Sequence, residues 1–130
     1  MEEALRTYLL AQSGVSSLVS TRAHWNMRPQ GTALHALVLA VIDRSPAYAM
    51  DGNSALAETR VQVDCYGTTY SQAKTLARAV RVPLDGKRFT QSSIRFEAFR
   101  LDERDLSEAG TTEGERIHRI SLDFQIWHQE

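Results

Sequence analysis

Two segments of the chain alternate apolar and polar residues with the period of a half-buried β-strand. The first covers residues 57–66 and the second covers residues 119–128. Successive side chains on a strand point to opposite faces, so each segment has one face for a core and one polar face. The apolar sets are Thr59, Val61, Val63 and Cys65 in the first segment and Ile120, Leu122, Phe124 and Ile126 in the second. Both segments are predicted to belong to one sheet, with Cys65 as a buried thiol.

An amphipathic helix is predicted directly after the first of these strands. Gly67 breaks the alternation, and Thr69 and Gln72 have the spacing of a capping box, in which Thr69 caps an early helical N–H and Gln72 reaches back. Pro83 has no backbone N–H to donate, so the helix should end near Val82. The stripe expected to pack on the sheet is Tyr70, Ala73, Leu76, Ala77 and Val80.

The N-terminal part of the chain predicts another helix and a buried strand. Residues 2–12 repeat apolar side chains at helical spacing, and residues 15–19 fit one further turn. Residues 21–31 read as a short extended segment followed by a loop. Residues 36–42 are apolar on both faces, which is typical of a central strand covered on two sides. Residues 43–46 are predicted to end that strand.

The remaining segments predict a turn, a strand and a long loop. Residues 47–56 fit a loop or hairpin tip. Residues 92–101 fit a strand whose alternation shifts, which indicates either a β-bulge near Ala98 or Phe99 or burial on both faces. Residues 102–115 are acidic and glycine-containing, and are predicted to be a loop. The order of elements predicts an α+β fold: one domain, residues 1–130, with helices packed on a mostly antiparallel sheet.

The composition argues against several classes of protein but does not point to a particular reaction or ligand. Hydrophobic residues make up 42%, charged residues 24%, and the net charge of −1 gives no overall bias toward nucleic acid or anionic lipid. The longest apolar run is too short to cross a bilayer, the acidic start is unlike a secretory signal, and a single cysteine forms no internal disulfide. We therefore expect no membrane contact.

The search for catalytic and metal-binding motifs is negative. The sequence has no phosphate-binding glycine motif, no H-E-x-x-H and no C-x-x-C. No two of its histidines have helical metal-ligand spacing, and His118 and His128 are expected at the surface or at a sheet edge. Asp64 and Asp123 lie on polar strand faces, where solvated carboxylates are the expectation and a cross-sheet pair is the alternative. We predict no enzyme activity, no cofactor and no metal.

Two groups of residues are candidate contact sites. The first group consists of aromatic, methionine and arginine residues outside the predicted core. These residue types are enriched at protein interfaces. These interface candidates are Trp25, Met27, Arg28, Tyr48, Met50 and Trp127. For Trp25 the alternative is that it caps the core.

The second group is the acidic segment, which carries five net negative units because six acids stand against Arg104. Its acids are Asp102, Glu103, Asp105, Glu108, Glu113 and Glu115. From the residues alone, the segment is interpreted as a solvated hairpin tip.

Several segments together resemble a known family. They are the helix at the start, residues 24–31, residues 37–39, residues 60–67, the helix at 70–80 and residues 119–127. In this order and spacing they are similar to the tail-completion, or tail-terminator, proteins of long-tailed phages, prophages and gene transfer agents. The strand Arg-Val-Gln-Val-Asp-Cys-Tyr and the closing Ser-Leu-Asp-Phe are the most specific parts.

The resemblance implies a structural role in a virion. Such proteins are α+β subunits that form a ring, commonly a hexamer, at the head-proximal end of the tail tube. The ring ends tube polymerisation and joins the tail to the head, so the implied partners are further copies, the tail tube protein and the head–tail connector. DNA would pass without specific binding. The acidic segment, residues 102–115, would face the channel or a neck protein, where its negative charge would keep the passing DNA from adhering. The implied location is the virion, after assembly in the bacterial cytoplasm.

Two other functions remain open at the sequence level. One is a different neck or tail-tube component. The other is a small cytosolic α+β binding module, or an enzyme whose site is assembled from scattered residues. Ring-shaped particles would favour a virion component, whereas a small ligand that raises the melting temperature of a monomer would favour the binding module.

Overall fold

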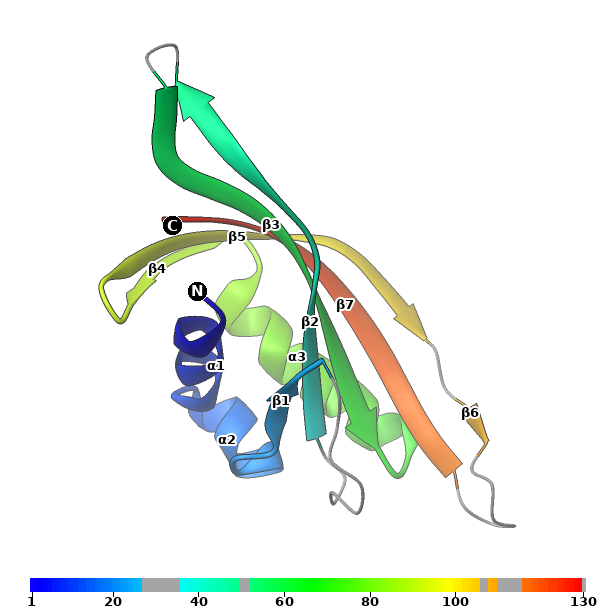
Figure 1. The fold of residues 1–130 in the computed structure, drawn as a ribbon. Helices are drawn as coiled ribbons and strands as arrows, with labels where there is room; N and C mark the ends of the chain where they lie inside the picture. Colours follow the sequence, from blue (N-terminus) through cyan, green and yellow to red (C-terminus); the bar gives the residue numbers. More distant parts are fainter. Residues whose placement is uncertain (27–35, 50–51, 106–107, 110–115, 130) are drawn as a thin grey trace.

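The fold is an α+β sandwich with three helices on one side of a curled sheet (Figure 1). A computed structural model describes residues 1–26, 36–49, 52–105, 108–109 and 116–129. The helices are α1 (Glu2–Leu10), α2 (Ser13–Val19) and α3 (Tyr70–Leu84), and the strands are β1 (Ala23–Trp25), β2 (Ala36–Ala49), β3 (Gly52–Gly67), β4 (Lys87–Gln91), β5 (Ile94–Asp105), β6 (Glu108–Ala109) and β7 (Arg116–Gln129). The strand order is β1-β2-β3-β7-β5-β4, with β6 against β7. Only β1 and β2 pair in parallel among the described strands, so the predicted fold class is confirmed.

The core lies between the sheet and the helices, and strands β3 and β7 supply its centre. They pair antiparallel, with Val61 opposite Phe124 and Val63 opposite Leu122. All eight predicted inward residues of these two strands are buried, including Cys65. The helix stripe is also confirmed except at Tyr70, which is 47% exposed. Tyr70 begins α3, and its ring lies edge-on to His118 instead of entering the core.

The start of α3 is fixed by a cap and by a close approach to β3. Thr69 Oγ1 accepts from the backbone N–H of Gln72 at 3.2 Å, as predicted. The Gln72 side chain bonds one residue earlier than a capping box requires, because its Oε1 accepts from the backbone N–H of Thr68 at 2.9 Å. A Cβ at Gly67 would lie 2.8 Å from the backbone nitrogen of Ala73, so only glycine fits there without a shift.

Helix α3 also runs two residues past its predicted end, to Leu84. Pro83 lies in the final turn, where the helix loses only the hydrogen bond that proline cannot donate. The carbonyl of Pro83 accepts from the Tyr8 hydroxyl at 2.8 Å. The Tyr8 ring stacks on Phe89, so α1, the end of α3 and β4 are held together.

The prediction that residues 43–46 end the second strand is wrong. Strand β2 continues to Ala49 and forms a long hairpin with β3, and the register shift at Ile42 lets the pairing continue past the polar residues. The predicted hairpin is therefore present, with longer strands, and residues 50–51 lie outside the described part. Pairing of β3 with β7 ends at Leu56 and Gln129. Beyond that point the hairpin projects as a two-stranded ribbon (Figure 1).

The hairpin of β4 and β5 was not predicted from the sequence. Its turn, Ser92-Ser93, has positive φ at both residues, a conformation that usually signals glycine or asparagine. The bulge expected near Ala98 or Phe99 occurs instead at Leu101, between Arg100 and Asp102. The alternative of burial on both faces is wrong for Phe99 and Leu101, because both side chains are exposed.

Candidate functional site

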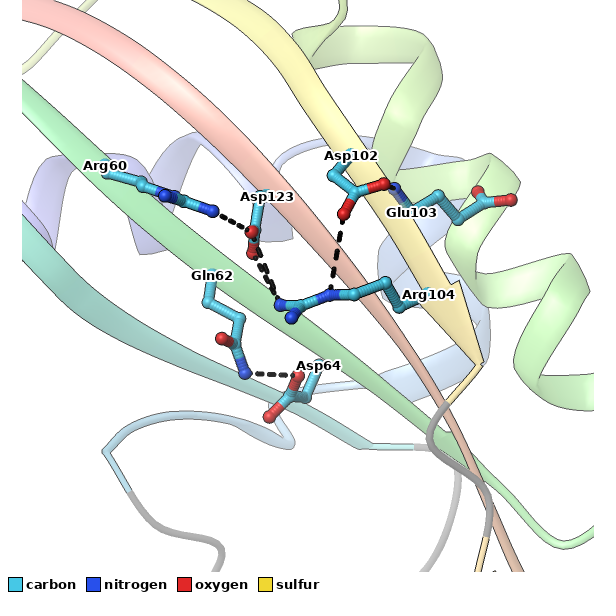
Figure 2. A network of polar contacts seen from close by, with 7 residues as sticks. All are labelled: Arg60, Gln62, Asp64, Asp102, Glu103, Arg104 and Asp123. Carbon is cyan, nitrogen blue, oxygen red and sulfur yellow. Dashed lines mark hydrogen bonds and ion pairs between the residues drawn. The ribbon is translucent and has the colours of Figure 1, made fainter.

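A buried carboxylate organises the sheet face opposite the helices. Asp123 on β7 is 1% exposed and lies between Arg60 of β3 and Arg104 of β5. Its Oδ2 accepts from Arg60 Nη2 at 2.6 Å and from Arg104 Nη2 at 3.3 Å (Figure 2). Arg104 Nε also lies 3.7 Å from Asp102 Oδ2. The network therefore spans three adjacent strands.

The expectation of solvated carboxylates at Asp64 and Asp123 is wrong. Both are buried, although no helix covers this face in Figure 1. Arg60 and Arg104 reach Asp123 from the two neighbouring strands, and their side chains remain partly exposed, at 47% and 44%. Asp64 accepts separately from Gln62 Nε2 at 3.0 Å, so the alternative of a direct Asp64–Asp123 pair is not formed.

The bulge at Leu101 places β5 residues in this arrangement. After the shift, Asp102 lies opposite Asp123 and Arg104 lies opposite Ser121, so both share the polar face. Glu103 points the other way, and its Oε2 accepts from Lys74 Nζ of α3 at 3.0 Å. The hydrogen bond and charge of Asp123 raise the pKa of Arg60, and the hydrogen bond to Glu103 raises the pKa of Lys74.

His128 is buried, so its expected position at the surface is wrong. Its Nε2 and the Thr59 Oγ1 are hydrogen-bonded at 2.6 Å. Thr59 belongs to the inward face of β3, where its hydroxyl needs a partner, and His128 supplies one. His118, at the other end of β7, is half-buried.

Three large apolar side chains are exposed on the edge regions of the sheet. Ile42 is 50% exposed and Leu101 is 49% exposed, and each is the extra residue of a bulge. Phe99, next to the second bulge, is 41% exposed. Strand β1 pairs only with residues 37–39 of β2, and β4 pairs only with residues 94–98 of β5. In the described part of the chain, the outer edges of residues 40–49 and 99–105 therefore have no strand partner.

A pocket of about 500 Å³ lies beside Trp127. Arg88, Glu97 and Trp127 form a cross-strand row in its wall, with Arg88 Nε 3.3 Å from Glu97 Oε1. Leu56 and Arg95 also line it. The pocket combines apolar walls with two guanidinium groups and one carboxylate, a composition that suits an apolar segment bearing negative charge.

The predicted interface residues do not form one patch. Trp25 lies in edge strand β1, packs against the core and donates from Nε1 to the Glu2 carbonyl at 3.1 Å. Trp127 lies in β7, three strands further across the sheet. Tyr48 lies opposite Asn53 in the projecting ribbon. Met27, Arg28 and Met50 lie outside the described residues, so their roles stay predictions.

The prediction that residues 102–115 form a loop is wrong for its first part. Asp102, Glu103 and Asp105 belong to β5, and Glu108 belongs to β6. Glu113 and Glu115 lie outside the described residues. Asp102 and Glu103 already have partners on opposite sheet faces, in Arg104 and Lys74. A role of this segment at a channel or neck stays a prediction.

The described residues offer contact surfaces and no recognised reaction centre. No group of three or more His, Cys, Asp or Glu side chains among them is placed to hold a metal ion. Burial raises the pKa of the Cys65 thiol, which keeps it protonated and unreactive. No helix in this part of the chain is long and apolar enough to cross a membrane. The sequence did not predict the Asp123 network or the pocket lined by Arg88, Arg95 and Trp127. Alternation along a strand predicts the face on which a residue lies, but not which residues of other strands surround it.

These features describe an α+β subunit whose candidate sites are a polar sheet face, strand edges and a pocket. The comparison with known families is specific: residues 3–129 match the family described as Tail completion protein gp17, and the chain belongs to that family. It is therefore a tail structural protein of phage-like particles, as the sequence resemblance indicated.

Solved structures repeat the fold. A chain of the virion of a native gene transfer agent particle matches with a TM-score of 0.67 at 22% identity, covering 100% of this chain and 95% of that chain. Another solved chain matches with a TM-score of 0.53 at 12% identity, covering 97% of this chain and 95% of that one. No curated protein matches the sequence.

Proposed function

We propose that this protein forms a ring at the head-proximal end of a tail tube, ends tube polymerisation and joins the tail to the head. The observation that carries the proposal is the family match over residues 3–129. The related fold in a gene transfer agent virion supports the same setting. The partners are further copies of the chain, the tail tube protein and the head–tail connector, and DNA passes without specific binding.

The sheet edges supply surfaces suited to ring closure. A ring needs a heterologous contact, in which one patch meets a different patch on the next subunit. Residues 40–49 and 99–105 lie on strands at opposite sides of the sheet. Each edge carries an exposed apolar side chain, Ile42 on one and Leu101 on the other. Two unlike edges at opposite sides allow subunits to join in one direction around a ring of six.

The projecting part of the β2–β3 hairpin is a further contact element. An isolated two-stranded hairpin is only marginally stable in water. The part of the hairpin that lies beyond the β3–β7 pairing would therefore be stabilised by packing on a neighbouring subunit. It carries Tyr48, and the sequence adds Met50 at its end. We assign this ribbon to contact with a neighbouring subunit or the tube end.

Removal of the protein from particle-producing cells tests the proposal. Without a terminator, we expect tails of irregular, increased length and heads without tails, because tube growth has no stop and no joining surface. Electron microscopy of particles measures both, and expression of the intact chain from a plasmid should restore them. Normal tails with normal heads attached would contradict the proposal. Short or missing tails with filled heads would instead indicate a tube component.

A further inference from the structure

Each of the two long edges of the sheet has a step. Strand β1 covers only residues 37–39 of β2, and β4 covers only residues 94–98 of β5. Three antiparallel pairings separate β2 from β5, so these two strands run in opposite directions. The two covering strands, each near the start of its partner, therefore lie at opposite ends of the sheet (Figure 1). Each edge has a protruding part and a recessed part.

The strand registers show that the two steps are complementary. Across β3 and β7, Leu39 of β2 lies level with Glu103 of β5, and Arg44 lies level with Ala98. Strand β1 therefore protrudes at the level where β5 is recessed, and β4 protrudes at the level where β2 is recessed. A second copy placed beside the first, with its strands in the same direction, brings β1 and β4 into one shared strand position.

The outer side of β1 has backbone groups suited to a further strand. The carbonyl of Arg22 and the N–H of Asn26 bond to β2, so the alternate residue Trp25 directs its backbone groups away from β2. On the same side, the carbonyl of Ala23 accepts from Arg6 Nε at 2.7 Å. Trp25 is therefore the residue of β1 whose backbone is placed to pair with a neighbouring strand.

The matching position on β5 is held in place by the subunit itself. The backbone N–H of Glu103 donates to Asp102 Oδ1 of its own strand at 2.8 Å. The Glu103 side chain accepts from Lys74 Nζ of α3 at 3.0 Å. This part of the edge is therefore fixed before a neighbour arrives, which lowers the entropy lost on binding.

We propose that the β1–β2 edge of one copy joins the β4–β5 edge of a second copy. Strand β1 then lies beside residues 103–105 of the second copy, and β4 of that copy lies beside residues 44–46 of β2. The inference rests on the proposed ring and names the contact between its subunits. Trp25 and Glu103 exchange backbone hydrogen bonds in an antiparallel pair, because β1 runs with β2 and against β5. Since the two edges are unlike, every added copy leaves an edge open for the next, as a ring requires.

Exposed apolar side chains favour a second copy as the occupant. In the described part of the chain, neither β1 nor β4 covers the levels between Ala40 and Asp43 on β2. The exposed side chains Ile42, Phe99 and Leu101 lie at these levels of the two edges. In the joined sheet they come together beside the gap between β1 and β4, and both copies remove apolar area from water. A foreign strand on one edge would leave the apolar side chains of the other edge exposed.

Cross-linking in intact particles tests the contact. Neighbouring strands lie about 4.8 Å apart, so residues on β2 and β5 are about 10 Å apart across the shared position. A chain with Ile42→Cys and Leu101→Cys should give a ladder of covalent multimers with a bis-maleimide of that span. Each single variant should remain a monomer, and Cys65 is buried and adds no link. Ile42→Cys combined with Ser17→Cys, at an exposed position on α2, is the matched control and should give no ladder.

Hydrogen exchange measures the backbone pairing without any substitution. Peptides that cover Trp25 and residues 103–105 should exchange about tenfold more slowly in the assembled particle than in the isolated subunit, because paired amides open less often. Peptides from the exposed face of α2 serve as the internal reference. Equal exchange in the two states would overturn the pairing.

The outcomes separate the inference from the proposed function. A ring in the particle without a ladder from the double variant would overturn the inference and leave the proposed ring standing. Covalent dimers from Ile42→Cys alone would also overturn it, because they indicate a two-fold contact between like edges. Absence of any ring from the wild-type particle would remove the proposed function and the inference with it.

Discussion

At the scale of residues, the carboxylate of Asp123 joins three strands on the sheet face opposite the helices. Asp123 is almost fully buried, yet it is satisfied because two guanidinium groups reach it from neighbouring strands. The alternation of β7 predicts which way Asp123 points. It does not predict the burial or the partners of Asp123, because both depend on strands that are distant in sequence. The buried charge of Asp123 on β7 is thus balanced by residues of two other strands, β3 and β5.

Replacement of Asp123 by asparagine should lower the free energy of unfolding by about 2 kcal/mol. The variant keeps the shape but leaves two guanidinium groups without their shared anion, and hydrogen bonds to charged groups contribute about 1.5–3 kcal/mol. The partial exposure of both arginines holds the loss below that of a fully buried pair. Urea unfolding followed by tryptophan fluorescence measures it. Asp102→Asn, an exposed neighbour, is the control, and an equal loss in both variants would contradict the central role of Asp123.

At the scale of elements, the strongly periodic segments were predictable and the irregular ones were not. Residues 57–66 and 119–128 have the predicted faces because a single buried side fixes a period of two. The extent of β2 was not predictable, since a bulge at Ile42 carries the strand through polar residues and a proline. The β4–β5 turn contains only Ser92-Ser93, a weaker turn signal than glycine or asparagine, and the hairpin was therefore not predicted.

Leu122→Ala on β7 should destabilise the protein by about 2–5 kcal/mol, because it leaves a cavity in the fully buried core. Leu101→Ala removes the same atoms from a bulge that is half exposed, and should cost less than about 1 kcal/mol in the isolated chain. Chemical denaturation of both variants gives the difference. Similar losses at the two positions would mean that the register of β7 against β3 is incorrect.

At the scale of the whole molecule, the fold class and the family were accessible from the sequence, and the candidate surfaces only in part. Trp127 does border a pocket. Arg88 and Arg95 line the same pocket because they belong to the β4–β5 hairpin, which was not predicted from the sequence. The projecting ribbon was predicted only as a turn. A surface assembled from several strands depends on their register, and register follows from tertiary packing.

Tyr48→Asp combined with Met50→Asp should impair assembly while leaving the subunit folded. The ribbon lies beyond the pairing with β7, so added charge there disturbs no core residue but opposes apolar contact with a neighbour. Particle counts and tail lengths by electron microscopy measure the effect. Val82→Asp, at an exposed apolar position on α3, is the control. Wild-type particle numbers in the ribbon variant would show that the ribbon makes no necessary contact.

The position of β7 also has a consequence for synthesis of the protein. This strand follows all others in the chain order, yet it lies in the middle of the sheet between β3 and β5. While the ribosome is still making β7, the strand that pairs with both β3 and β5 is missing from the sheet. Asp123 therefore cannot yet bring Arg60 and Arg104 together. Folding should therefore complete only once β7 has been made, with a large share of long-range contacts formed in one late step. Chains that stop before β7 should therefore be more sensitive to protease than the intact chain.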